Sequence, residues 1–298
     1  MTTTLEHVHH TAHEADPSAG GLGTPPAGRS ADAAQADVRP LRRSYGPGGR
    51  LRFGRGLGVL VLLLVWTVGS ATGLIDPRIL AAPWQVATAA GELVGTGRLQ
   101  ESLLASLTRA GAGIALGVVA GVALAAVAGL SRWGESLIDG PVQVKRSIPT
   151  LALMPLLILW FGIGEEMKVT TIALATLIPV YMNTFDGLRS IDRRFVELAS
   201  TLEVSRAEFL RRVILPGSMP GVVLGLRYGV TAGLLALVVV EQVNTTSGLG
   251  YMITLASNYG QTEIIVVGLV TYAVLGVTAD AVLRAVGRRA LSWRRTIS

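Results

Sequence analysis

Six apolar stretches of about the length that crosses a lipid bilayer constrain this chain more than any other feature of its sequence. A hydrocarbon core of roughly 30 Å requires about 20 predominantly apolar residues in a helix. Stretches of this kind occupy residues 57–75, 110–130, 148–163, 169–185, 222–243 and 264–286. Only 15% of the residues are charged, which is too few for an ordinary soluble globule. The sequence therefore predicts an all-α, polytopic membrane protein with about six transmembrane helices.

The distribution of Arg and Lys predicts which side of the membrane each connection faces. Arginines precede the first stretch, recur through residues 186–221 and follow the last stretch. The predicted external connections hold only Arg78, Arg98 and Lys168, with Arg109 at a boundary. Because Lys and Arg accumulate on the cytoplasmic side, we expect a protein of the cell (plasma or inner) membrane with both termini inside. The membrane thus accounts for the net charge of +6, and no nucleic-acid partner is required.

Composition divides the chain into three parts. Residues 1–50 are rich in Ala, Gly, Pro, Ser and Thr and lack periodicity, which predicts a disordered cytoplasmic tail. This tail contains all four histidines, His7, His9, His10 and His13. Because a tail has no fixed geometry, we assign them no metal-binding role. Residues 51–290 are expected to form the transmembrane domain, and residues 291–298 a cytoplasmic tail. Without cysteine, disulfides and thiolate chemistry are excluded.

Small residues and prolines add expectations about individual helices. Gly113, Gly117 and Gly121 recur every four residues, so one helix face lacks side chains and another backbone can approach it. Residues 83–109 have amphipathic spacing and predict an external helix that leads into the second span.

The connection at residues 131–147 is expected to be cytoplasmic. The third span should then begin near Ile148 and become irregular at Pro155.

The most charged connection, residues 186–221, contains an amphipathic helical pattern. The pattern predicts two short helices or one bent helix, stopped by Pro216. One interpretation is a surface helix that lies on lipid head groups. The other is a helix whose apolar face is buried against a partner protein.

The spacing in this connection resembles the EAA loop of ATP-binding-cassette importer permeases. That loop reads Glu-Ala-Ala, three residues, Gly, nine residues and Ile-x-Leu-Pro. The matching residues are Glu197, Ala199, Leu215 and Pro216. Leu198 and Val213 replace the second and the Ile positions, and Glu203 stands where the family has Gly. If that Gly supplies a left-handed turn between two helices, Glu203 costs roughly 1–2 kcal/mol; otherwise the helix continues unbroken.

Residues 147–164 and 247–251 also look like segments of permeases for sulfonate, taurine, nitrate and related solutes, and the resemblance covers roughly residues 57–289. It implies a type I importer permease fold, a homodimer, two cytoplasmic ATPase subunits and an external solute-binding protein that delivers a small polar solute, such as one of these anions. It also implies a coupling loop that contacts the ATPase through Glu197, Ala199, Glu203, Arg211, Arg212, Leu215 and Pro216.

The chemistry of ATP is expected to belong to the partner. No Gly-x4-Gly-Lys-Ser/Thr phosphate loop occurs in the sequence, so ATP and Mg²⁺ would be bound by the ATPase subunit. The chain itself is therefore interpreted as a transport subunit that is not an enzyme and binds no cofactor.

Polar and aromatic residues in the spans are the candidates for the translocation path, namely Trp160, Tyr181, Asn183, Thr184 and Glu241. Packing or hydrogen bonding between helices is the alternative for each. Glu241 and Arg227 lie close enough to span ends that they could extend to the membrane interface. Asp280 can pair with Arg284, one helical turn away.

Two other functions are compatible with a polytopic membrane protein. A secondary transporter driven by an ion gradient should show inverted repeats and paired carboxylates at mid-membrane, and neither is evident in the sequence. A membrane scaffold that transports nothing would use the arginine-rich connection only to fix its orientation.

Overall fold

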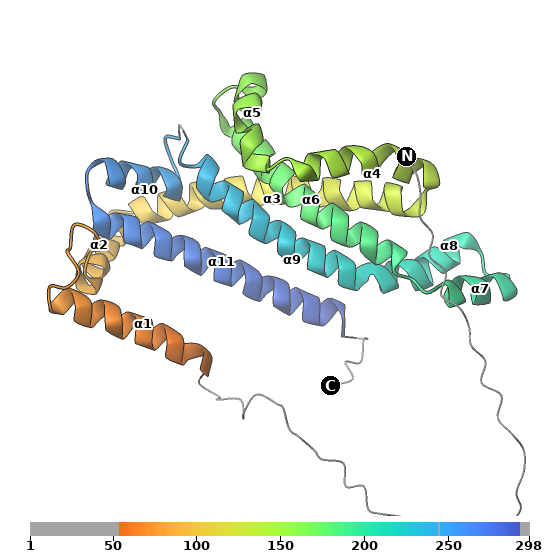
Figure 1. Ribbon diagram of the computed structural model, residues 1–298, viewed down its shortest axis with the longest axis horizontal. Helices are drawn as coiled ribbons and strands as arrows, with labels where there is room; N and C mark the ends of the chain where they lie inside the picture. Colours follow the sequence, from red (N-terminus) through yellow and green to blue (C-terminus); the bar gives the residue numbers. More distant parts are fainter. Residues whose placement is uncertain (1–53, 244, 293–298) are drawn as a thin grey trace, which may run out of the picture. The chain divides into compact units, whose positions relative to one another are not determined.

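The computed structural model describes residues 54–243 and 245–292, and these residues form helices joined by turns and short connections, with no strand among them (Figure 1). The predicted N-terminal tail with its four histidines lies outside the described residues, as do residues 293–298. The prediction of an all-α fold is confirmed.

The helices follow one another along the chain as α1 (Gly54–Ala71), α2 (Pro83–Gly95), α3 (Arg98–Leu130), α4 (Arg132–Ser147), the 3₁₀ turn η1 (Thr150–Leu153), α5 (Met154–Phe161), α6 (Glu165–Arg189), α7 (Arg193–Thr201), α8 (Arg206–Phe209), the π-helical turn η2 (Leu210–Ile214), α9 (Leu215–Val240), α10 (Leu249–Asn258) and α11 (Thr262–Ala290).

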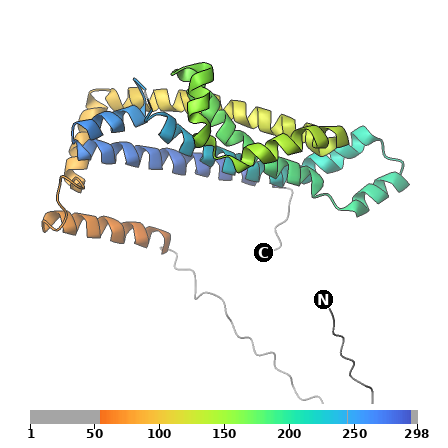
Figure 2. The ribbon, with the colours of Figure 1, turned by 45° about the horizontal axis from the view of Figure 1, so that its top comes forward.

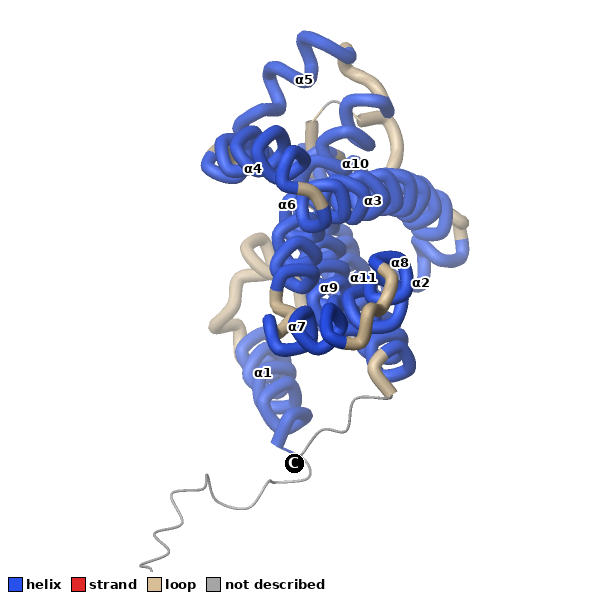
Figure 3. Tube along the Cα trace, turned by 90° about the vertical axis from the view of Figure 1, so that its right-hand side faces the viewer, coloured by secondary structure: helices blue, strands red, loops and turns tan. Residues whose placement is uncertain are grey.

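Helix α6 packs along both α3 and α9, and these two pairs make the most extensive contacts among the described helices (Figure 3). The approach is close because glycines face α6 from both sides. Gly117 of α3 lies against the backbone of Ala173, and Gly229 of α9 lies against Val180. The predicted glycine face of α3 is therefore confirmed as a packing surface.

We expect the substitution Gly117→Ala to destabilise this interface. A Cβ atom at Gly117 would lie 2.5 Å from the carbonyl oxygen of Ala173, so the two backbones would have to separate. Overpacking of this kind costs about 1–3 kcal/mol, and the melting temperature of the detergent-purified permease should fall by several degrees. The matched control is Gly111→Ala on the same helix, because a Cβ atom there meets nothing within 4 Å. Equal melting temperatures for the two variants would contradict the close approach.

Two sequence predictions about connections are corrected. The external helix predicted at 83–109 is two helices, because Gly97, with a φ of 77°, breaks the chain between α2 and α3. The connection predicted at 131–147 is helix α4, which packs against α3. The side chain of Ser131 starts α4 by accepting a hydrogen bond from the Gly134 backbone N–H, 3.3 Å away.

The third predicted span is also not a straight helix. The segment of η1 and α5 is bent by 91° from α4. The irregularity lies before Pro155 rather than at it. Proline fits the first turn of α5 because its missing N–H has no helical partner there.

Three described helices are long and apolar enough to cross a bilayer: α3, the continuous segment Arg206–Val240, and α11. The bent pair of α4 with η1 and α5 adds a fourth if it counts as one span. A total of about six spans is reached only if α6 and the shorter apolar helix Leu57–Ala71 also cross the membrane. For these two helices, the crossing stays a prediction. Large apolar side chains such as Leu62, Val119 and Leu235 are exposed, as expected for surfaces that face lipid.

Candidate functional site

The predicted coupling loop folds as α7 and α8, which lie beyond the ends of the long helices and are coloured teal (Figure 2). The carboxylate of Asp192 starts α7 by accepting a hydrogen bond from the Arg194 backbone N–H at 3.0 Å. Phe195, Leu198 and Leu202 follow one helix face, and their side chains are 55–65% exposed. A short helix therefore presents an apolar face that nothing in the described protein covers.

Glu203 ends α7 in a left-handed conformation. Its φ is 51°, and no other non-glycine residue in the described chain has a positive φ. The Val204 N–H donates to the Ala199 carbonyl at 3.0 Å, and the Glu203 N–H donates to the Ser200 carbonyl at 3.3 Å. These are the two bonds of a Schellman motif, whose left-handed position is usually Gly. Of the two outcomes expected for Glu203, the left-handed turn is the correct one.

The variant Glu203→Gly should stabilise the loop by about 1 kcal/mol, because Gly adopts the left-handed conformation without the Cβ penalty. Amide hydrogen exchange of residues 199–204 would show this as about fivefold stronger protection. Glu203→Ala removes the same side chain but keeps a Cβ atom, so it is the matched control and should leave the exchange nearly unchanged. Equal protection in both variants would show that the turn is unstrained.

The second half of the loop does not stop at Pro216. Helix α8 passes through the π-helical turn η2 directly into α9, and Pro216 lies in the first turn of α9. The prediction that Pro216 ends the helix is therefore wrong. The π-helical turn shifts the hydrogen-bond pattern just before the proline, so that the Leu215 N–H donates to the Leu210 carbonyl. Single π-helical turns occur frequently at functional sites.

The polar residues of the coupling loop point to the surface. Glu197, Arg211 and Arg212 are exposed, and Arg212 pairs with Glu208 at 3.1 Å. Leu215 is also exposed, whereas Ala199 and Pro216 are half-buried. The structure thus gathers the predicted residues on one projecting segment, and their contact with an ATPase stays a prediction.

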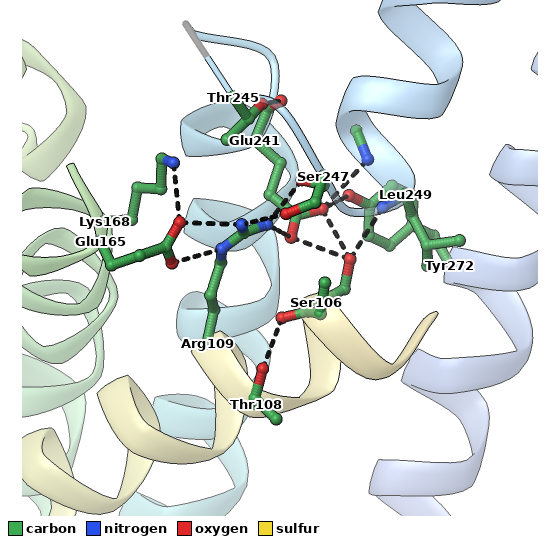
Figure 4. Close-up of polar contacts among 12 residues, drawn as sticks. Ser106, Thr108, Arg109, Glu165, Lys168, Glu241, Thr245, Ser247, Leu249 and Tyr272 are labelled. Atoms are coloured by element: carbon green, nitrogen blue, oxygen red, sulfur yellow. Dashed lines mark hydrogen bonds and ion pairs between the residues drawn. The ribbon is translucent and has the colours of Figure 1, made fainter. Parts of the chain in front are cut away.

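A second site lies at the other end of α6 and α9, where the guanidinium of Arg109 lies between two carboxylates (Figure 4). Its Nη1 donates to Glu241 Oε1 at 2.8 Å and to the Ser247 carbonyl at 2.7 Å. Its Nε and Nη2 donate to the two oxygens of Glu165 at 2.6 and 2.8 Å. Nη2 also donates to the Ser247 hydroxyl at 2.8 Å. Arg109 therefore links α3 to α6, to α9 and to the segment before α10.

Glu241 is fully buried and completely bonded. Besides Arg109, its carboxylate accepts hydrogen bonds from the hydroxyls of Ser106 and Tyr272, both at 2.7 Å, and from the Gly250 N–H at 3.0 Å. The interpretation of Glu241 as a side chain that reaches the interface is therefore wrong. A Cβ atom at Gly248 or Gly250 would lie 2.5 Å from Glu241, which explains the two glycines of the Ser-Gly-Leu-Gly segment.

The outer part of this site is different, because Glu165 is exposed. Lys168 donates to Glu165 Oε1 at 3.0 Å from a buried position. The hydrogen bond from Arg109 is the largest of the effects that lower the pKa of Glu165 below its usual value, with Lys168 adding to it against partial burial. Glu165 is consequently ionised at neutral pH.

Sequence reasoning missed this four-charge cluster. The sequence placed Arg109 only at a span boundary. Ser106, which also binds Glu241, lies one helical turn before it. The usable signals were a cation in an apolar stretch and a carboxylate in another. The predicted pair of Asp280 with Arg284 is present, and Arg227 pairs with the same carboxylate at 2.8 Å.

The candidates for the translocation path lie in varied environments. Trp160 is exposed, Tyr181 is buried and stacks on Phe185 at 5.6 Å, and Asn183 donates to the Pro179 carbonyl at 2.8 Å. Thr184 is buried, and its hydroxyl has no hydrogen-bond partner among the described residues. Their place along a path stays a prediction. No group of three His, Asp or Glu residues suited to a metal ion occurs in the part of the chain that the structure describes.

Comparison with known proteins gives consistent relatives. The family model described as "Binding-protein-dependent transport system inner membrane component" matches residues 113–292. The chain is 42% identical over 232 residues to the putative aliphatic sulfonates transport permease protein SsuC of Escherichia coli (strain K12), covering 78% of this chain and 88% of that protein. It is 34% identical over 238 residues to the taurine transport system permease protein TauC of the same organism, covering 78% and 86%. The crystal structure of an amino acid ABC transporter with histidines has the same fold, with a TM-score of 0.58, 20% identity, and coverage of 67% of this chain and 97% of that one.

Proposed function

Because this chain belongs to the family of binding-protein-dependent transport system inner membrane components, we propose that it carries aliphatic sulfonates, taurine included, across the membrane. It is a membrane permease subunit of an ATP-binding-cassette importer, and ATP hydrolysis belongs to a separate ATPase subunit. The observation that carries the substrate class is the 42% identity to a sulfonate permease over 88% of that protein.

We further propose that α7 and α8 form the segment that docks on the ATPase. The exposed apolar face of α7 supports this, since an apolar groove on a partner would remove it from water. A helix that lies on lipid head groups is the alternative. The left-handed turn at Glu203 supports docking, because it sets a defined angle between α7 and α8, as a shaped groove requires. Closure of two ATPase subunits would then move the paired loops of a homodimer and expose the central path to each side in turn.

The remaining partners follow from the same proposal. An external solute-binding protein delivers the sulfonate to the face opposite the coupling loop. The arginine bias of the connections supports a cytoplasmic position for that loop and for both termini.

The test is uptake of radiolabelled taurine and ethanesulfonate by cells that lack the gene, with and without a plasmid copy. We expect uptake and growth on either sulfonate as sole sulfur source only with the plasmid. Uptake by proteoliposomes that contain the complete transporter should require ATP on the side where the ATPase subunits lie. It should be insensitive to ionophores. Uptake driven by an ion gradient alone would establish the secondary transporter instead, and equal uptake without the gene would refute the substrate class.

A further inference from the structure

We propose that Arg109 and Lys168 form a binding site for a monoanion, and that the Glu165 carboxylate occupies this site until an anion displaces it. The inference rests on the proposed function for its ligand class, an organic sulfonate. It gives the permease itself an anion-binding position.

Burial separates the two cations from the carboxylate that they bind. The side chains of Arg109 and Lys168 are only 6% and 5% exposed, whereas that of Glu165 is 58% exposed. A buried cation without a partner is costly, but an exposed carboxylate can leave for water at little cost. The exchangeable member of the cluster is therefore Glu165.

The way Glu165 is bound resembles the way a sulfonate would be bound. Both of its oxygens accept hydrogen bonds from the Nε and Nη2 edge of Arg109, at 2.6 and 2.8 Å, and Lys168 Nζ reaches one oxygen at 3.0 Å (Figure 4). This fork of parallel N–H groups recognises any group with two coplanar anionic oxygens. Two of the three sulfonate oxygens can take these positions, and the third or the alkyl chain can point outward.

Charge balance then selects a single negative charge. With Glu165 in place, two cations face two carboxylates and the cluster is neutral. Glu241 cannot leave, because it is fully buried and bonded to Ser106, Tyr272 and the Gly250 N–H. When Glu165 turns away, one net positive charge remains, which a monoanion neutralises. A solute without an anionic group leaves the cluster unbalanced, whereas the sulfonate group of taurine neutralises it even though taurine also carries an ammonium.

The position of Glu165 permits the exchange without unfolding a helix. Glu165 is the first residue of α6. The N-cap residue before it is Gly164, which has no side chain to cap the helix. Rotation about the Glu165 side-chain bonds is sufficient to release both oxygens into solvent. The N-terminal end of α6 adds a positive partial charge near the vacated site.

The test measures binding of radiolabelled ethanesulfonate to the complete permease–ATPase complex in lipid nanodiscs, without the solute-binding protein. If Glu165 holds the site about nine-tenths of the time, Glu165→Gln should tighten ethanesulfonate binding by up to about tenfold. The matched control is Glu166→Gln, which removes the same charge from an exposed neighbour that forms no ion pair in the described chain. It should bind within about twofold of the wild type.

Removal of a cation should have the opposite effect. Lys168→Met should weaken binding by about tenfold or more, because a charged hydrogen bond to the anion is lost. The double variant Glu165→Gln/Lys168→Met has the same net charge as the wild type, so it should keep the wild-type melting temperature and bind ethanesulfonate about tenfold or more weakly than Glu165→Gln.

Three results would overturn the inference: undetectable ethanesulfonate binding in both the wild type and Glu165→Gln, equal affinity in Glu165→Gln and Glu166→Gln, or equal affinity in Glu165→Gln and the folded double variant. The proposed function is tested separately, by the uptake of sulfonates into cells. A wild type that imports taurine while Glu165→Gln shows no tightening refutes only the anion site. A wild type that binds ethanesulfonate but imports none refutes only the proposed cargo.

Discussion

Replacing Arg109 with methionine is expected to lower the free energy of unfolding by about 3–5 kcal/mol, because the substitution leaves the buried Glu241 carboxyl group without its counter-charge. It also removes the bonds that hold the Ser247 backbone and hydroxyl. Denaturation of the detergent-purified permease in a series of sodium dodecyl sulfate concentrations measures the loss. We expect the segment before α10 to become sensitive to protease at the same time.

Two further variants make the Arg109 prediction specific. Arg227→Met removes an ion pair with Asp280 whose members are 49% and 31% exposed, so it should cost no more than about 1 kcal/mol. Arg109→Met/Glu241→Met removes both buried charges and should recover part of the lost stability. A loss for Arg109→Met no larger than that for Arg227→Met would mean that the cluster is not a structural link.

Features with a local physical cause could be predicted from the sequence. The apolar stretches gave the helices, since backbone groups in a bilayer must be paired within a segment. The recurrence of Gly113, Gly117 and Gly121 every four residues predicted the packing face of α3, because residues with this spacing lie on one side of a helix. Glu203 could be singled out in the same way, since a left-handed turn penalises any residue with a Cβ atom.

Features that depend on distant parts of the chain could not be predicted. Glu241 is 132 positions from Arg109, and no pattern within either segment indicates that the two meet. The bend between α4 and the segment of η1 and α5, and the π-helical turn before Pro216, are likewise features that hydrophobic periodicity does not indicate. Pro155 and Pro216 were both misleading, because proline disrupts the interior of a helix but is tolerated in its first turn.

The coupling loop and the Arg109 cluster lie at opposite ends of the same pair of helices. Helix α6 begins at Glu165 and ends at Arg189, next to α7, while α9 begins after η2 and ends next to Glu241. The two helices pack backbone to backbone at Gly225 and Gly229, so neither can slide far without the other. Movement imposed on the loop would therefore reach the cluster through a stiff connection rather than through a flexible one.

Leu198→Asp is expected to abolish ATP-driven uptake while the permease itself stays folded. Leu198 is 55% exposed in the centre of the apolar face of α7, so a carboxylate is tolerated there in water. Burying that carboxylate in an apolar groove of the ATPase would cost 2 kcal/mol or more, which corresponds to about a 30-fold weaker complex. Co-purification of the ATPase with tagged permease, and taurine uptake by the same cells, measure the effect.

Ser200→Asp provides the matched control for Leu198→Asp, because Ser200 is exposed on the opposite side of α7 and receives the same charge. It should retain the ATPase and most of the uptake, and both variants should keep the wild-type melting temperature. The comparison decides between the two interpretations of the loop. A helix that rests on lipid also buries its apolar face, so Leu198→Asp would weaken its contact with the membrane but leave co-purification of the ATPase unchanged. A helix seated in a groove distinguishes the two faces, because only the face in contact must lose its water.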